Sequence, residues 1–294
     1  MRASRSRSMQ MMVASIPLVT VGPIEAVVFF AELMVGTALF AVVFDLMGSA
    51  IRGYVGTTFA IAAAIGGIGL LLAPTFSTLL PVIPGAPGGS AFGKEIATTM
   101  HWYVWAFVAV VFGAVAAIEL QDRARRVLGI GVGAVLVLFL AHLVGTVSAA
   151  FQVGWHGWFT MGSGTVILGA VLGGMLMGHW YLVAPGMSFR PLRQTVIVIF
   201  IAIAGAVATM VAAFATSPPK MGHAVLAYDG GWLFWLLTVG SLVGFTTVVN
   251  SLTWHFTKMR ANQPATAMLY GLIVAVCIGV ISAHVLMFQT GVPV

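Results

Sequence analysis

The chain has 294 residues, of which 60% are hydrophobic and 7% are charged, with a net charge of +6 and one cysteine, Cys277. A soluble globular domain carries about 25% charged residues, so this composition excludes a water-soluble fold and indicates a protein that lies in lipid. The single cysteine excludes a disulfide framework and cysteine-ligated iron–sulfur or zinc sites within the chain, and the loops are too short and too weakly basic for nucleic-acid binding.

Eight apolar windows follow a basic N-terminal segment, residues 1–23, which is too broken by Pro17 and Gly22 to cross a bilayer itself. A spanning helix needs about 20 mostly apolar residues. The windows of this length are 24–47, 53–73, 101–119, 127–150, 157–183, 195–216, 231–256 and 265–288. Such lengths predict helices rather than barrel strands. We therefore expect an all-α polytopic membrane protein with about eight transmembrane helices in one domain, 24–288, and a short tail, 289–294.

Basic residues alternate between the loops, which predicts the orientation of the chain. The loops after the first, third, fifth and seventh windows hold Arg52, Arg123, Arg125, Arg126, Arg190, Arg193, Lys258 and Arg260. The other loops hold only Lys94 and Lys220. The positive-inside rule places the first set in the cytoplasm, so both termini are expected outside the cell membrane. The basic N-terminal segment disagrees with this, and seven helices with an inward N-terminus are the alternative.

The eight windows could form two four-helix bundles that arose by duplication. Ala141-His142 in the fourth window and Ala283-His284 in the eighth hold equivalent places if 24–150 and 157–288 are repeats. Because each unit has an even number of helices, the two halves would be parallel repeats.

Glycine is abundant, with 35 residues, and it recurs at helical spacing in the fifth window. Gly169 with Gly173, and Gly174 with Gly178, each form a G-x-x-x-G pair. Small residues at this spacing let helix backbones approach closely in lipid. The fifth helix is therefore expected to pack tightly against its neighbours.

Ionisable side chains inside membrane helices are costly, so they are functional candidates by default. On the predicted orientation, the outer half of the membrane contains Glu32, His101, His142, His156 and His284. At about 1.5 Å per residue, Glu32 and His142 lie about 12 Å below the outer boundary and His284 lies about 6 Å below it. A carboxylate at the depth of Glu32 must pair, stay protonated or face a cavity.

The inner half of the membrane contains a smaller group. His179 lies near the inner end of the fifth window, in "GGMLMGHWYLVAP", and His255 lies near that of the seventh. Interface aromatics such as Trp180 and Tyr181 anchor helix ends at the headgroup level, but they do not account for the histidine beside them. Asp45 ends the first window and is expected to snorkel or to pair with Arg52.

The first interpretation of the histidines is b-type haem. Two neutral imidazoles on facing helices ligate one iron, and a haem near each face would carry electrons across the membrane. His142 with His284 is the candidate outer pair, and His179 with His255 is the candidate inner pair. His156 is a further candidate for cofactor binding.

The second interpretation is quinone or quinol chemistry. Oxidation of a quinol needs a proton acceptor near its hydroxyl, and a histidine or a carboxylate suits that role. Glu32 with His101 supplies such groups at the outer depth, with His156 as an alternative partner. Eight helices with both termini outside are also similar in topology to the polysulfide-reductase type of quinone-handling membrane anchor, in helix count and orientation alone. Such a subunit would need redox partner subunits.

The third interpretation is transport, in which Glu32, Asp45 and buried histidines form a proton relay. Most candidates lie toward one face or the other, however, and the middle of the membrane is almost purely apolar. The sequence therefore favours a membrane subunit of an electron-transfer system that handles quinone or quinol, with haem b as a candidate cofactor. A proton-coupled small-molecule transporter is the alternative. The expected partners are the lipid bilayer and redox subunits, without nucleic acid.

Overall fold

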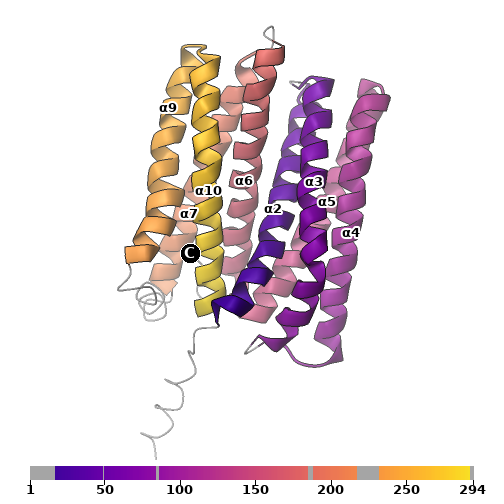
Figure 1. Ribbon diagram of the computed structural model, residues 1–294, viewed down its shortest axis with the longest axis vertical. Helices are drawn as coiled ribbons and strands as arrows, with labels where there is room; N and C mark the ends of the chain where they lie inside the picture. The colour runs from indigo at the N-terminus through magenta and orange to yellow at the C-terminus, as the bar shows by residue number, and fades with distance from the viewer. Residues whose placement is uncertain (1–16, 49, 84–85, 185–187, 217–231, 292–294) are drawn as a thin grey trace, which may run out of the picture.

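The computed structural model of the chain describes residues 17–48, 50–83, 86–184, 188–216 and 232–291. Within these residues, eight helices are long and apolar enough to cross a membrane. They stand side by side as one elongated bundle (Figure 1). The predicted all-α polytopic fold is therefore confirmed.

The helices follow the order of the predicted windows. They are α2 (Leu18–Leu46), α3 (Arg52–Leu79) with a short 3-10 turn, η1 (Leu80–Val82), α4 (Ser90–Glu119), α5 (Asp122–Phe151), α6 (Gly154–Val183), α7 (Arg190–Thr216), the π-helical η3 (Phe234–Phe245) that continues as α9 (Thr246–Lys258), and α10 (Asn262–Thr290).

Several helices extend beyond the apolar windows that predicted them. The helix α4 begins at Ser90 rather than at residue 101. Its first turns bury Phe92 and Ile96 at helical spacing and expose Lys94 and Glu95. An amphipathic turn of this kind lowers the local hydropathy without ending the helix, so a window based on hydropathy stops too early. Similarly, α2 begins at Leu18, inside the segment expected to precede the first helix.

The eight helices form two rings of four. In the first ring, α2 packs against α3 and α5, and α4 packs against α3 and α5; in the second, α6 packs against α7 and α10, and α9 packs against both of these. The rings meet where α2 lies against α6, with α5 against α6 and α10 against α2 on either side. The two halves thus share one order of neighbours, as parallel repeats would, and the duplication itself stays a prediction.

Glycine brings the two rings into close contact, as the G-x-x-x-G pairs predicted. A side chain at Gly36 of α2 would overlap the carbonyl of Thr165 and the backbone of Gly169 in α6. One at Gly173 would overlap the ring of Phe40. The Tyr54 hydroxyl of α3 donates a hydrogen bond to the Gly173 carbonyl across the same seam, at 3.1 Å. The absence of side chains therefore places α2 and α6 backbone to backbone.

The two ends of the bundle differ in charge. The connections that follow α2, α4, α6 and α9 lie at one end, the top of Figure 1, and carry the basic residues that the sequence assigned to the cytoplasm. We call it the basic end. The start of α2 and the end of α10 lie at the opposite end. The orientation in a membrane stays a prediction, and Arg2, Lys220 and His223 lie outside the described residues.

Candidate functional site

Among the Asp, Glu, His, Lys and Arg side chains of the described residues, five are less than 5% exposed, and they form two clusters. Glu25, Glu32 and His284 form one near the start of α2. Asp45 and Arg125 form the other at the basic end. Glu25 and Asp45 are 20 positions apart on α2 (45 − 25), so the clusters are separated by about 30 Å along the helix.

The first cluster places one histidine between two carboxylates, and we call it the Glu–His–Glu cluster. The Nδ1 atom of His284 in α10 lies 3.2 Å from Oε1 of Glu25 in α2, within hydrogen-bond distance. The Nε2 atom on the other side of the ring lies 3.8 Å from Oε1 of Glu32. Burial is complete for Glu32 and His284, and 2% of Glu25 is exposed. The cluster therefore joins the two helix rings by a polar contact inside the bundle.

The cluster is incompletely hydrogen-bonded. Both carboxylate oxygens of Glu32, Oε2 of Glu25 and Nε2 of His284 have no hydrogen-bond partner among the described residues. Buried polar atoms are almost always paired, so an exception calls for an explanation by function, ion or water. These unpaired atoms can each take or give a proton, and they make this cluster the candidate functional site.

The sequence builds the cluster from simple helical spacing. Glu25 and Glu32 are seven residues apart, which is about two turns and places both on one face of α2. On the facing helix α6, a side chain at Gly164 would lie 3.2 Å from Oε2 of Glu32 and 3.5 Å from Nε2 of His284. The glycine thus leaves space beside the reactive atoms. Phe288 stacks on the His284 ring from one turn further along α10, with ring centroids 5.9 Å apart.

A narrow cleft leads to the cluster between α6, α7, η3 and α10. The residues around it include the buried His284 and Gly164 and the half-buried Ser163 and Ala206, and from this difference in burial we infer that the mouth of the cleft is at Ser163 and Ala206. The cavity volume is about 10 Å³, which is about the room that one water molecule needs. The buried hydroxyl of Thr160 also lines it and has no hydrogen-bond partner in the described part of the chain.

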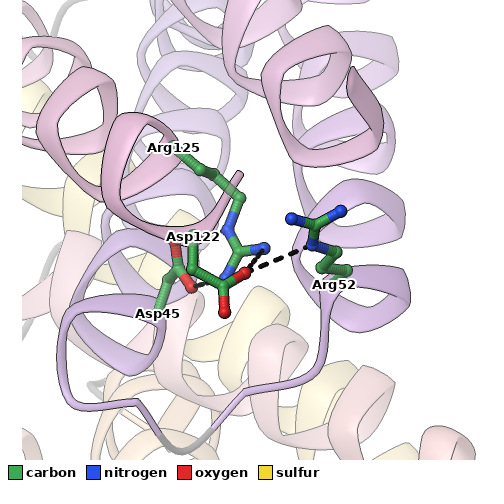
Figure 2. Close-up of polar contacts among 4 residues, drawn as sticks. All are labelled: Asp45, Arg52, Asp122 and Arg125. Carbon is green, nitrogen blue, oxygen red and sulfur yellow. Dashed lines mark hydrogen bonds and ion pairs between the residues drawn. The ribbon is translucent and has the colours of Figure 1, made fainter. Parts of the chain in front are cut away.

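The second cluster is a closed set of ion pairs (Figure 2). The Arg125 guanidinium donates to both carboxylate oxygens of Asp45, at 2.9 and 2.5 Å, and to Asp122, at 3.0 Å. Arg52 of α3 donates to the same oxygen of Asp122, at 3.2 Å. The expectation that Asp45 snorkels or pairs with Arg52 is therefore wrong: its partner is Arg125 of α5, and both lie in the interior.

The histidines expected near the outer face lie in different environments. His101 is exposed on α4, well inside that helix, because α4 begins at Ser90. His142 of α5 is half-buried and stacks on Trp102 of α4, with ring centroids 5.5 Å apart. His156, near the start of α6, stacks on Trp155, and its Nε2 lies 3.4 Å from the Thr216 hydroxyl. The structure therefore brings Glu32 together with His284, while His101 points away from the bundle interior.

The expected inner pair also lies outside the protein core. His179 of α6 and His255 of α9 are both exposed on the surface of the bundle. His142 and His284, the expected outer pair, have separate neighbours, Trp102 for the first and Glu25 for the second. No group of three or more His, Cys, Asp or Glu that could hold a metal ion is present among the described residues. Haem binding by either expected pair therefore stays a prediction.

Glu25 is the functional candidate that sequence reasoning missed. It lies near the start of the first helix and looks like an ordinary polar residue at a membrane boundary. Its distance of two helical turns from Glu32 was the available signal. Two carboxylates on one face of an otherwise apolar helix need a common partner, and His284 is that partner.

In comparisons with protein-family models, with curated proteins and with solved structures, the chain has no match. The similarity to polysulfide-reductase anchors therefore rests on helix count and predicted orientation, and functional inference depends on the site itself.

Proposed function

We propose that the chain is the membrane subunit of an electron-transfer system, and that it accepts protons from a quinol, or returns them to a quinone, at the Glu–His–Glu cluster. The observation that supports this is a fully buried histidine between two carboxylates, whose unpaired atoms border a water-sized cleft. Ionisable groups retained inside a membrane protein without complete pairing are characteristic of proton pathways.

The cluster has the arrangement that a proton acceptor needs. In the tautomer that carries its proton on Nδ1, His284 donates a hydrogen bond to Glu25, and Nε2 is then the unprotonated nitrogen. Glu32 lies beyond Nε2, so a proton taken up by the ring has a carboxylate to stabilise it or to receive it. Oxidation of a quinol releases two protons and two electrons. His284 and Glu32 take up the protons, and the electrons pass to a redox partner subunit.

The cleft gives the site access to the lipid. Ser163 of α6 and Ala206 of α7 are half-buried at its mouth, where a quinone dissolved in the bilayer arrives from the side. One water molecule fits between this mouth and His284, and a general base can act through one water. The headgroup therefore docks at the mouth while the proton travels inward.

Haem b is not part of this proposal, because the residues present do not fit it. His284 alone has the surroundings of a ligand, with Nδ1 held by a carboxylate and Nε2 unpaired. The space beside Nε2 admits a water molecule and not a macrocycle.

A proton-coupled transporter is the second candidate, and the π-helical η3 favours it. Long π-helical stretches are rare and occur mostly at functional sites. Leu242 of η3 borders the cleft, and the Ser241 hydroxyl bonds the Ala275 carbonyl of α10, at 2.9 Å. A change of register in η3 would alter the cleft and could admit a solute to the same proton-binding residues.

Photoaffinity labelling tests the quinone site. The purified full-length chain is irradiated with an azido-ubiquinone, and the labelled peptides are mapped by mass spectrometry. We expect labels on α6 and α10 that excess decylubiquinone removes. Gly164→Ala is expected to lower the labelling severalfold, because its methyl group fills the inner end of the cleft. Gly162→Ala is the matched control, since this glycine is also on α6, does not line the cleft, and has no atom within 4 Å of the added methyl group.

Proton uptake separates the two functions. Proteoliposomes that contain a pH-sensitive dye are prepared with the wild-type chain and with His284→Gln. Site-specific labelling that Gly164→Ala lowers severalfold and Gly162→Ala leaves unchanged supports quinone handling. If the label is spread evenly over the lipid-facing helices, the quinone proposal fails. Proton flux that depends on His284 without any quinone would then assign the cluster to transport.

A further inference from the structure

Three arginines surround a pocket at the basic end, far from the Glu–His–Glu cluster. Arg190 and Arg193 come from the first turn of α7, and Arg260 comes from the turn between α9 and α10. Ser188 and Phe189 complete the lining of the pocket, whose volume is about 290 Å³. We call it the arginine pocket.

The backbone at the start of α7 adds positive charge to the pocket, besides the charge of the arginine side chains. Ser188 precedes the helix, and its hydroxyl accepts a hydrogen bond from the Arg190 backbone N–H, at 3.2 Å. The start of a helix carries partial positive charge from its unpaired N–H groups. The pocket therefore combines this partial charge with three guanidinium groups.

The arginines of the pocket lack the carboxylate partners that Arg52 and Arg125 have at the same end. Among the ion pairs of the described residues, Arg52 and Arg125 bind aspartates, and none involves Arg190, Arg193 or Arg260. The buried Nε of Arg193 has no hydrogen-bond partner in that part of the chain, and its Nη2 makes only a long contact of 3.4 Å with the Thr257 carbonyl.

The sequence of the second half explains why no internal partner is at hand. From residue 154 to the end, the chain contains one acidic residue, Asp229, which lies outside the described residues. Arg260 also adopts a left-handed backbone conformation, with φ of 55°, at a helix end where glycine is the usual residue. The chain thus places an arginine there in spite of the conformational cost.

We propose that the arginine pocket binds a phosphate-bearing anion, and that the anion is the headgroup of an acidic phospholipid. Arginine is suited to this role because its planar guanidinium can donate two parallel hydrogen bonds to phosphate oxygens. The site lies at the end of the bundle that the charge distribution assigns to the membrane face where acidic lipids attract basic residues. The inference is independent of the proposed quinone chemistry.

An adjoining pocket favours a lipid as the source of the phosphate. Phe189 lines both the arginine pocket and this second space of about 410 Å³, whose other lining residues are Tyr181, Leu182, Ala261, Asn262, Gln263 and Pro264. Leu182 is 51% exposed at the end of α6. A phospholipid with its phosphate on the arginines can therefore place its glycerol and upper acyl carbons in this space, which offers polar side chains to the first and apolar ones to the second. A soluble phosphate would use only the first pocket.

Native mass spectrometry of the detergent-purified full-length chain tests the proposal. The chain is mixed with phosphatidylglycerol or with phosphatidylcholine of the same acyl length, and bound lipids are counted. Arg190→Gln with Arg193→Gln is compared with Arg123→Gln and Arg126→Gln, which removes two charges at the same end and with the same spacing. We expect the pocket variant to bind phosphatidylglycerol about fivefold or more weakly, since each basic residue near a membrane surface contributes about this factor. The control variant and phosphatidylcholine binding should not change.

A thermal unfolding series with inorganic phosphate distinguishes the source of the anion. If phosphate raises the unfolding midpoint of the wild-type chain and not of the pocket variant, while phosphatidylglycerol binding is unaffected, the pocket binds a soluble phosphate-bearing anion. If both double variants lose phosphatidylglycerol equally, or neither does and phosphate has no effect, the proposal is overturned. Arg260→Gln, a single change in an exposed turn, provides a second variant if the double variant does not fold.

Discussion

The two buried charge clusters lie near opposite ends of α2 and differ in how completely they are bonded. At the basic end, the Asp45 carboxylate receives two hydrogen bonds from Arg125, one on each oxygen. At the other end, neither oxygen of Glu32 has a hydrogen bond within the described part of the chain, although both clusters are almost wholly buried. Burial alone therefore does not distinguish them.

This difference separates a structural role from a functional one. A buried ion pair whose atoms are all bonded holds helices together and has nothing left to offer a ligand. A buried cluster with unpaired oxygens and an unpaired ring nitrogen is costly to keep, and the cost is understandable only if a water, a proton or a substrate uses those atoms. We therefore infer that Asp45 and Arg125 anchor helices, and the proton chemistry proposed above rests on Glu25, Glu32 and His284.

The largest expected effect on stability comes from breaking the ion pair between Asp45 and Arg125. Arg125→Met leaves the Asp45 carboxylate buried without its partner, and removing one member of a buried pair costs about 3–5 kcal/mol. The free energy of unfolding of the detergent-solubilised chain should fall by this amount. Replacing both members, with Asp45→Leu and Arg125→Met, should recover most of the loss, because no lone charge remains. An equal loss in the single and double variants would contradict the anchoring role.

The sequence predicted the fold because a long apolar run can adopt few structures other than a helix in lipid. A helix satisfies its own backbone hydrogen bonds, so about 20 apolar residues determine an element without reference to the rest of the chain. The tight packing of α6 was predictable for a similar reason, since G-x-x-x-G spacing is a property of one helix. What hydropathy could not locate were helix ends such as Ser90, where amphipathic turns continue the helix.

The candidate site was only partly predictable, because pairing depends on how helices are rotated against one another. Glu32 was recognisable alone, as a carboxylate in an apolar helix. Its partner His284 is far along the chain, and Asp45 and Arg125 are 80 residues apart. A nearby residue such as Arg52 is an attractive partner in sequence, but the packing of α2 against α5 decides the pair. Only residues that share a face of one helix, such as Glu25 and Glu32, can be placed together from their spacing in the sequence.

A smaller effect on stability is expected at the Glu–His–Glu cluster, where fewer hydrogen bonds can be lost. Glu32→Gln keeps the size of the side chain and removes its acid group. Because neither oxygen of Glu32 has a hydrogen-bond partner among the described residues, the substitution breaks no hydrogen bond there, and the free energy of unfolding should change by less than about 1 kcal/mol. Proton uptake in proteoliposomes should fall in the same variant. A loss of stability as large as that of Arg125→Met would place this cluster with the structural one.

The smallest effect is expected at the exposed edge of the bonded cluster, where Arg52 meets Asp122. Their side chains are 49% and 63% exposed, so water and salt compete for both charges. An exposed ion pair contributes about 0.2–1 kcal/mol, and Arg52→Gln should lower the free energy of unfolding by no more than this. Raising the salt to about 1 M, where the screening length is about 3 Å, should remove the difference from the wild-type chain. Asp122→Asn provides the control, because Arg52→Gln should then have no further effect. A larger, salt-independent loss would mean that Arg52 supports the buried pair through Asp122, and that the bonded cluster extends to the surface of the protein.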